Sequence, residues 1–297
     1  MAIVRLAYKL EDGLNLIDLA QGLSITERRL IRQKQVFTVM GGAISDGAYT
    51  AGGGNSAIKI STAPNNFYTR NAVTRGFRAW KAMRKKVLET ETSIIPAKYA
   101  DFKVLLDESA SGYYRRPMHA GSVPMTAGEW DYSDMTADNP APDDGTNQTR
   151  VFHIVGNQHT NSRYCLSLGW LQTRAAPQVE EPNMPDLNGD GNEDINVDFI
   201  TTLFQDTNES VLRADDVVDE GDVPPFARLE LMTTQSAYSA SEPNNCQLQF
   251  FVNPKNDDLH VPVPGFQALC GLIRVDVGSD YTNPILILDV ETKGWSF

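Results

Sequence analysis

The chain closes with GLIRVDV (271–277) and PILILDVET (284–292), two segments rich in β-branched residues and bounded by Gly, Asn, Asp and Pro. This composition is typical of β-strands. Five earlier segments share it: GEWDYSDM (128–135), TRVFHIVG (149–156), RYCLSLGWLQTR (163–174), ARLELMTT (227–234) and CQLQFFVN (246–253). Three more strands are predicted near the start of the chain: IVRLAYKL (3–10), VFTVMGGAIS (36–45) and SAIKIST (56–62). About ten strands predict a mainly β protein.

The clearest helix in the sequence covers residues 69–90, because apolar residues recur there every three or four positions. That stripe consists of Val73, Phe77, Trp80, Met83 and Val87. A second helical piece is predicted at AKYADFKVLLD (97–107). Together they predict a helical insertion near residues 66–108 between early and later strands.

A shorter helix is predicted nearer the start of the chain. Ser24 and Glu27 have the Ser-x-x-Glu spacing of a capping box. We therefore expect this helix to run from Ile25 to about Gln33.

The bulk composition is that of a globular protein: the chain has 297 residues, 41% of them hydrophobic and 22% charged. No clean linker is visible, so we expect one domain over residues 1–297.

No run of 18 apolar residues occurs, which predicts no membrane span. The first residues reach charged positions too soon for a signal peptide, so we expect synthesis in the cytoplasm. Cys165, Cys246 and Cys270 lack metal-ligand spacing and are expected to be small buried hydrophobes.

Charge is divided along the chain. Residues 1–120 carry 18 Lys and Arg against 10 Asp and Glu, and residues 121–297 carry 8 against 28, although the total is only −12. Such a division suits a protein with one surface toward a polyanion and another toward water. Chance clustering is the alternative.

The strongest basic run lies on the predicted helix, where seven basic residues and no acidic one occur from Asn66 to Leu88. On the side away from the apolar stripe, Arg75, Arg78, Lys81 and Lys85 are candidate phosphate contacts. A solvated helix face, or one paired with the acidic half of a neighbouring subunit, explains them equally well. Residues that would extend such a patch are Arg28, Arg29, Arg32, Lys34, Arg115 and Arg116.

A calcium-binding loop is predicted at DLNGDGNEDI (186–195). Side-chain oxygens at positions 1, 3, 5 and 9 and the carbonyl at position 7 converge on the cation in such loops, and Gly191 permits the turn. The predicted ligands are Asp186, Asn188, Asp190, Asn192 and Asp194. Hard oxygen ligands favour Ca²⁺ over softer metals. Position 12 is Val197, so the bidentate Glu of an EF-hand is missing, and Asp198 is the nearest substitute.

Catalysis has little support in the sequence. No G-x-S-x-G, G-x-x-x-x-G-K-[ST] or H-E-x-x-H motif is present. Four histidines are scattered, two of them in FHIVGNQH (152–159), and the carboxylates of DDVVDEGD (215–222) are typical of a solvated loop. We expect no enzymatic activity. A glycoside hydrolase with paired carboxylates is the remaining enzyme class, and no spacing singles out such a pair.

Several segments together resemble the capsid proteins of small single-stranded DNA viruses, known mainly from environmental and marine sequences. The segments are DLAQGLSITERRLIRQKQVFTV (18–39), NAVTRGFRAWKAM (71–83), AKYADFKVLLD, EWDYSDM (129–135), FHIVG (152–156), SLGWLQTRA (167–175), DEGDVPPF (219–226), CGLIRVDV (270–277) and ILILDVETKG (285–294). Their order covers roughly residues 15–295. Many capsid proteins of this kind carry a basic N-terminal arm, and this chain has none, which shifts genome contact toward the basic helix.

The resemblance implies a jelly-roll β-sandwich that self-assembles into an icosahedral shell around a DNA genome, located in the virion, without catalytic residues. A single barrel is favoured because a double jelly roll needs sixteen strands, and about ten are found. Bound Ca²⁺ in the acidic region, about residues 175–225, would neutralise repelling carboxylates at subunit contacts.

The alternative function is a calcium-dependent β-sandwich module that binds carbohydrate or a host surface. The predicted calcium loop and the aromatic residues Trp130, Tyr132 and Trp170 motivate it. Aromatic residues in strands are more often part of the core than a sugar-binding platform.

Overall fold

The computed structural model describes residues 2–45, 48–49, 57–90, 98–107, 111–119, 123–138, 147–157, 163–172, 232–233, 247–252, 260–294 and 296. The chain divides into two compact units, residues 1–172 with 229–297, and residues 173–228. The second unit lies wholly outside the described residues, so the single domain expected over residues 1–297 stays a prediction.

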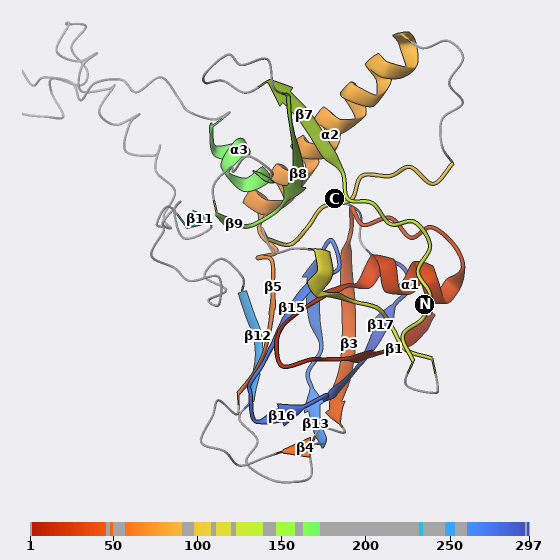
Figure 1. Ribbon diagram of the computed structural model, residues 1–297, viewed down its shortest axis with the longest axis vertical. Coiled ribbons are helices and arrows are strands. Elements are labelled where there is room, and N and C mark those ends of the chain that lie inside the picture. Colours follow the sequence, from red (N-terminus) through yellow and green to blue (C-terminus); the bar gives the residue numbers. More distant parts are fainter. Residues whose placement is uncertain are drawn as a thin grey trace, which may run out of the picture. The chain divides into compact units, whose positions relative to one another are not determined.

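The first large sheet contains five strands (Figure 1). They are β1 (Ile3–Lys9), β17 (Ile285–Glu291), β3 (Val36–Ser45), β13 (His260–Val263) and β14 (Phe266–Leu269). Strand β17 lies between β1 and β3, and both β13 and β14 pair with β3. All of these pairings are antiparallel.

The second large sheet has the order β12 (Gln247–Val252), β5 (Ile58–Thr62), β15 (Leu272–Val277), β2 (Gly13–Asp18) and β6 (Tyr114–Arg115). Its first four strands are antiparallel, whereas the short β6 lies parallel to β2 and covers that edge. Covering an edge strand removes a site for unwanted pairing with another chain. The protein is therefore mainly β and mainly antiparallel.

The strands follow one pairing rule. The main strands in chain order are β1, β2, β3, β5, β12, β13 with β14, β15 and β17. First pairs with last (β1 with β17), second with seventh (β2 with β15), third with sixth (β3 with β13 and β14) and fourth with fifth (β5 with β12). The chain thus forms one long antiparallel ribbon. Two further pairings, β17 with β3 and β15 with β5, join turns of that ribbon into the two sheets.

One hydrophobic cluster draws side chains from both large sheets. Along β17 every second residue is buried, and Leu286, Leu288 and Val290 join the cluster. From the other sheet, Ile273 and Val275 of β15 belong to the same cluster. Alternate burial along strands of both sheets is what a two-layer sandwich requires.

Between β5 and β12 the chain makes a long excursion. Its described elements include α2 (Phe67–Thr90), η1 (Ser111–Tyr113), β7 (Asp134–Asp138), β8 (Asn147–His153), β9 (Gly156–Asn157), β10 (Arg163–Cys165), α3 (Leu166–Gln172) and β11 (Met232–Thr233). Strands β7, β8 and β10 form a small sheet, β9 pairs with β11, and β4 (Ala48–Tyr49) pairs with β16 (Tyr281–Thr282) outside the excursion. A second hydrophobic cluster joins residues of the excursion to residues at the ends of β2 and β15.

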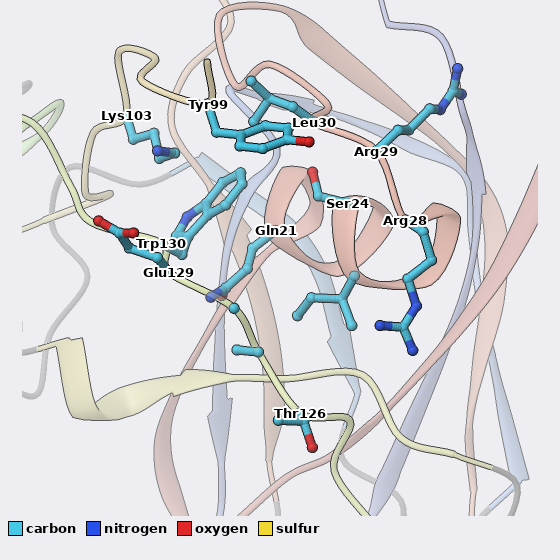
Figure 2. A pocket seen from close by; sticks show the side chains of 13 residues that line it. Gln21, Ser24, Arg28, Arg29, Leu30, Tyr99, Lys103, Thr126, Glu129 and Trp130 are labelled. Atoms are coloured by element: carbon cyan, nitrogen blue, oxygen red, sulfur yellow. The ribbon is translucent and has the colours of Figure 1, made fainter. Parts of the chain in front are cut away.

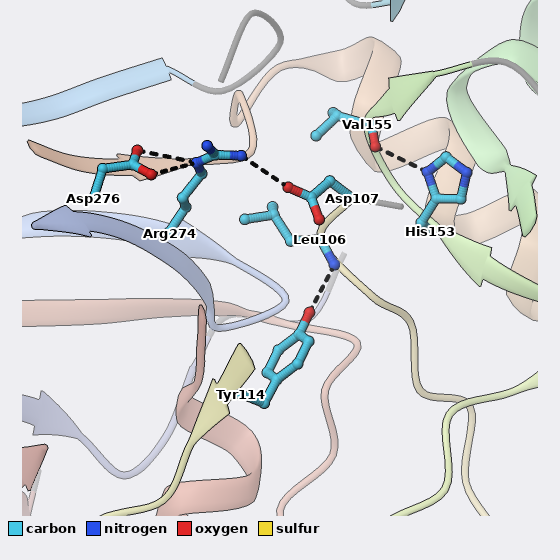
Figure 3. Close-up of polar contacts among 7 residues, drawn as sticks. All are labelled: Leu106, Asp107, Tyr114, His153, Val155, Arg274 and Asp276. Atoms are coloured by element: carbon cyan, nitrogen blue, oxygen red, sulfur yellow. Dashed lines mark hydrogen bonds and ion pairs between the residues drawn. The ribbon is translucent and has the colours of Figure 1, made fainter. Parts of the chain in front are cut away.

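A buried ion cluster also ties the excursion to the second large sheet (Figure 3). The Arg274 side chain on β15 is 4% exposed, and its Nη1 lies 3.3 Å from Asp107 Oδ2. Arg274 Nε lies 3.0 Å from Asp276 Oδ2 on the same strand. Nearby, Tyr114 on β6 accepts a hydrogen bond from the Leu106 amide at 3.0 Å. Residues 106–107 are thereby held against the outer face of the sheet.

The first helix differs from the predicted one. Helix α1 is Leu19–Glu27, so the expected span from Ile25 to about Gln33 is wrong. Asp18 is its N-cap and accepts a hydrogen bond from the Gln21 amide. Ser24 lies inside the helix, where its hydroxyl donates to the Ala20 carbonyl at 2.6 Å. Asp18 and Gln21 are three positions apart, which is the capping-box spacing that the sequence analysis assigned to Ser24 and Glu27.

The second helical piece predicted at residues 97–107 is also wrong, since the described residues 98–107 contain no helix. The backbone of this segment is hydrogen-bonded to residues at the end of β8 and just after it instead. Leu105 donates to the Phe152 carbonyl at 2.9 Å, and Ile154 donates to the Leu105 carbonyl at 3.1 Å. These lateral bonds override the local helical pattern, so the helical part of the insertion ends with α2.

Two predicted strands need similar correction. Residues 128–133 do not form a strand, and β7 begins only at Asp134. In residues 163–174 the strand β10 is three residues long and is followed by α3, because Leu166 packs against the second cluster beside α2. The expected strands at 3–10, 36–45, 271–277 and 284–292 are confirmed, as are the described parts of those at 56–62 and 246–253. The strand expected at 149–156 ends at His153, and the one expected at 227–234 lies outside the described residues except for Met232–Thr233. Cys165 and Cys270 are buried, as predicted, and Cys246 lies outside the described residues.

Candidate functional site

Helix α2 owes its position to one apolar side. Asn66 precedes the helix, and its Oδ1 accepts a hydrogen bond from the Thr69 amide at 2.9 Å, as an N-cap does. Val73 is fully buried in the second cluster, and Phe77 and Trp80 pack against it with ring centroids 5.9 and 6.0 Å from that of Phe102. The helix predicted at 69–90 is therefore confirmed, and four residues of its apolar stripe, Val73, Phe77, Trp80 and Met83, lie in or against the second cluster.

The opposite side of α2 carries the predicted phosphate contacts. Arg75, Arg78, Lys81 and Lys85 are all exposed. At 100° and 1.5 Å per residue, they occupy an arc of about 120° along about 15 Å of helix. Lys85 forms an exposed pair with Glu89 at 3.4 Å, which contributes little to stability. The structure thus brings the four cations together on one exposed surface, which we call the basic face.

Several cations on or near α2, including Arg75 of the basic face, contact aromatic rings. Arg84 lies 5.6 Å from the Trp80 ring centroid, and Arg75 lies 5.5 Å from that of Trp170. Lys34 lies 5.0 Å from the Phe77 ring, next to the same helix. Such cation–π contacts hold side chains in place without neutralising their charge. Lys34 therefore lies beside the apolar stripe of α2, and its part in a nucleic-acid patch stays a prediction.

Arg115 does not extend the basic face as expected. Its Nη2 lies 2.7 Å from Glu11 Oε2, and its Nε donates to Asn15 Oδ1 at 2.7 Å. These bonds fasten β6 to the start of β2. Its charge is thus compensated within the sandwich.

The predicted calcium loop lies outside the described residues. This covers all five expected ligands, which are Asp186, Asn188, Asp190, Asn192 and Asp194. Among the residues that the structure does describe, no group of three or more His, Cys, Asp and Glu is placed to hold a metal ion. The acidic region 175–225 is likewise outside them, so calcium binding stays a prediction.

The aromatic residues considered as a sugar platform are all partly buried. Trp130 donates a hydrogen bond from Nε1 to Asp18 Oδ2 at 3.0 Å. The Tyr132 ring packs on Tyr114 with centroids 5.3 Å apart, and Trp170 packs against Arg75. These residues serve packing, and they do not form a shared exposed surface.

The structure also contains a polar centre that the sequence analysis missed. Asp18 is 1% exposed, and its Oδ2 accepts from Gln33 Nε2 at 3.1 Å and from Trp130 Nε1. Burial raises the pKa of Asp18 to about 7, against the opposing effect of hydrogen bonds from Gln21 and Trp130 and the charge of Lys103. The cap spacing of Asp18 and Gln21 was the one local signal for this centre.

His153 is the described member of the FHIVGNQH pair. It is fully buried, and its Nδ1 lies 2.9 Å from the Val155 carbonyl (Figure 3). His159 lies outside the described residues. His153 is therefore the buried last residue of β8 rather than an exposed one.

Comparison of the chain with protein-family models, with curated proteins and with solved structures finds no match. In the described part of the chain, no helix is both long and apolar enough to cross a membrane.

Proposed function

We propose that this chain is a viral capsid protein whose sandwich is a jelly roll and whose copies self-assemble into an icosahedral shell around a small DNA genome. Such a protein is made in the host cytoplasm and resides in the virion. The observation that carries the proposal is the pairing rule of the main strands, first with last, second with seventh, third with sixth and fourth with fifth. A long antiparallel ribbon wound into two sheets of four is the jelly-roll topology.

The proposed barrel is single. One set of eight main strands accounts for both large sheets in the described part of the chain. The excursion from β5 to β12 occupies the middle of the sequence and carries helices and a small mixed sheet. A second barrel would need its own ribbon of eight strands. These features favour the single jelly roll over the double one.

Because many unrelated functions use the same fold, the proposal also needs a feature suited to a shell. The sequence resemblance to capsid proteins of small single-stranded DNA viruses is the first such feature. The basic face of α2 is the second, since exposed Arg and Lys in a row suit contact with a phosphate backbone. In this proposal the basic face points toward the genome.

Calcium is the proposed structural cofactor. Asp186, Asn188, Asp190 and Asp194 would bind the ion through side-chain oxygens, and Asn192 through its carbonyl, as the loop spacing indicates. An ion there would neutralise carboxylates of an acidic region at subunit contacts.

Electron microscopy of the purified full chain, with calcium and then with a chelator, tests this function. Closed shells of uniform size are the expected result with calcium. Shells that lose order or thermal stability after chelation support the calcium role, and a D186N/D190N variant should behave like the chelated protein. Monomers at all protein concentrations, with single-stranded DNA present as well as absent, would contradict the proposal.

A further inference from the structure

A cavity of about 240 Å³ lies between the C-terminal half of α1, residues 99–103 and residues 126–130 (Figure 2). It is separate from the basic face of α2. Three cations line it, Arg28, Arg29 and Lys103, against one carboxylate, Glu129. Two aromatic side chains, Tyr99 and Trp130, line it as well. The cavity thus combines positive charge with flat apolar surface.

Lys103 is the informative residue. It is only 7% exposed, and its ammonium group has no hydrogen bond or ion pair among the residues that the structure describes. Its Nζ lies 4.8 Å from the centroid of the Trp130 ring. Burying a cation without a hydrogen-bonded anion is unfavourable, and Asp18 and Asp101 act on Lys103 through their charges alone, so this buried lysine beside a cavity is suited to bind an anion.

The residues around Lys103 are held in fixed positions. Its amide donates to Ser133 Oγ at 3.0 Å, and its carbonyl accepts from the Ser133 amide at 2.8 Å. The neighbouring Val104 amide donates to Gln33 Oε1 at 2.6 Å. Trp130 is oriented by its hydrogen bond to Asp18. A site whose groups are oriented before binding loses less entropy when the ligand enters.

Arg28 contributes a second cation from the opposite side of the cavity (Figure 2). It ends α1 in the left-handed conformation, with φ of 55°, and its guanidinium has no partner among the described residues. Arg29 is already paired with Glu27 at 3.4 Å. Tyr99 is 63% exposed, so its ring is available to a ligand.

We propose that this cavity binds a nucleoside monophosphate, with the phosphate at Lys103 and the base against Tyr99 and Trp130, while Arg28 adds positive charge from the opposite side. The ligand is either a free nucleotide or one nucleotide of a single DNA strand. Aromatic rings bind bases of any sequence by stacking, and a cation binds the phosphate. A volume of about 240 Å³ lies below the usual range for drug-sized ligands and suits no more than one nucleotide.

The experiment titrates dAMP into the full chain by calorimetry, with deoxyadenosine and inorganic phosphate as comparison ligands. The background protein has Arg75, Arg78, Lys81 and Lys85 changed to Gln, which removes binding at the basic face. We expect dAMP to bind at least about tenfold more tightly than either comparison ligand, because only dAMP has both the base and the phosphate. Phosphate binding as tightly as dAMP would mean an adventitious ion only and would overturn the proposal, as would no binding of dAMP.

Three variants locate the site. Tyr99→Ala removes an exposed ring, and Lys103→Met keeps the aliphatic stem over Trp130 while removing the charge. Each should weaken dAMP binding by about tenfold or more, whereas the exposed Lys9→Met control should not change it. Unchanged dAMP affinity in the Tyr99 variant would overturn the proposal even if the Lys103 variant fails to fold.

A single-stranded oligonucleotide then separates the two sources of the ligand. Competition with dAMP assigns the site to a nucleotide of a strand, and lack of competition assigns it to a free nucleotide. Shell formation is scored separately by microscopy. Failure of the nucleotide site therefore leaves the proposed capsid function standing, and failure of assembly leaves the nucleotide site testable.

Discussion

Removing the four charges of the basic face should change how DNA binding responds to salt. The variant replaces Arg75, Arg78, Lys81 and Lys85 with Gln. All four side chains are exposed, and Gln has a helix propensity close to that of Lys and Arg, so α2 should remain folded. The main structural loss is the contact of Arg75 with Trp170, worth about 0.5–1 kcal/mol at an exposed site.

The expected magnitude follows from counterion release. On single strands, the slope of log affinity against log salt is about −0.7 for each phosphate contacted, so four contacts contribute about −2.8. Between about 50 and 200 mM salt, these contacts alone would weaken binding roughly 50-fold. The quadruple variant should lose this part of the slope and bind more weakly at low salt.

Fluorescence anisotropy with a labelled single strand, repeated over a salt series, measures both quantities. The matched control replaces four cations of the sandwich, Arg5, Lys9, Lys59 and Lys293, with Gln. Its net charge equals that of the α2 variant, so a general effect of charge would appear in both. An equal loss of slope in the two variants would refute the role of the basic face, and so would an unchanged slope in the α2 variant.

Three further predictions concern stability. The pKa of Asp18 is about 7 in the folded state and about 3.8 in the unfolded state. Between these two pH values the folded state therefore binds one proton more than the unfolded state. The free energy of unfolding should fall by up to about 1.4 kcal/mol per pH unit as the pH rises through that window. Urea unfolding at several pH values checks this, and Asp18→Asn should have a flatter profile than the wild type. Tyr8 is fully buried, and its hydroxyl has no hydrogen-bond partner among the residues that the structure describes, so Tyr8→Phe should be neutral or stabilise the protein by about 1 kcal/mol. The same change should relieve the damage caused by Gly22→Ala, whose new methyl group would meet that hydroxyl. Thermal unfolding of the single and double variants would show additive effects if this contact were unimportant. Finally, Arg274→Met should destabilise the protein by about 3–5 kcal/mol because it leaves Asp107 buried without its cation. Adding Asp107→Leu to this variant should restore part of the lost stability. Chemical denaturation that finds both single variants as stable as the wild type would contradict this prediction.

The sequence pattern predicts strands that have one buried and one less buried side. In β17 every second residue is buried, and the alternation is visible in the sequence. Strand β2 escaped prediction because both its sides are buried: Leu16 joins the second cluster, and Ile17 joins the first. A strand buried on both sides has no alternation, and β2 leads directly into α1 without a turn.

Local pattern also explains which candidate site could be found. The cations of the basic face repeat at helical spacing on one element, so the sequence alone places them together. The cavity is different, because Arg28, Lys103 and Trp130 come from three segments that only tertiary structure joins. The hydrogen bonds that hold the segment of Lys103 run to Ser133 and Gln33, and no local pattern indicates them.

The long excursion leaves and rejoins the sandwich at a single place, since Thr62 at the end of β5 pairs with Gln247 at the start of β12. The pairing of the eight main strands is therefore complete without it, although its short strand β6 covers the edge of β2. Entropy tolerates long insertions between paired ends. The packing is not complete without it. Leu16 and Leu272 are fully buried within the cluster that the excursion builds, and Arg274 has its buried partner Asp107 there. Replacing the excursion with a short turn would keep the topology but expose this apolar surface. The excursion is thus needed for packing where it covers β2 and β15.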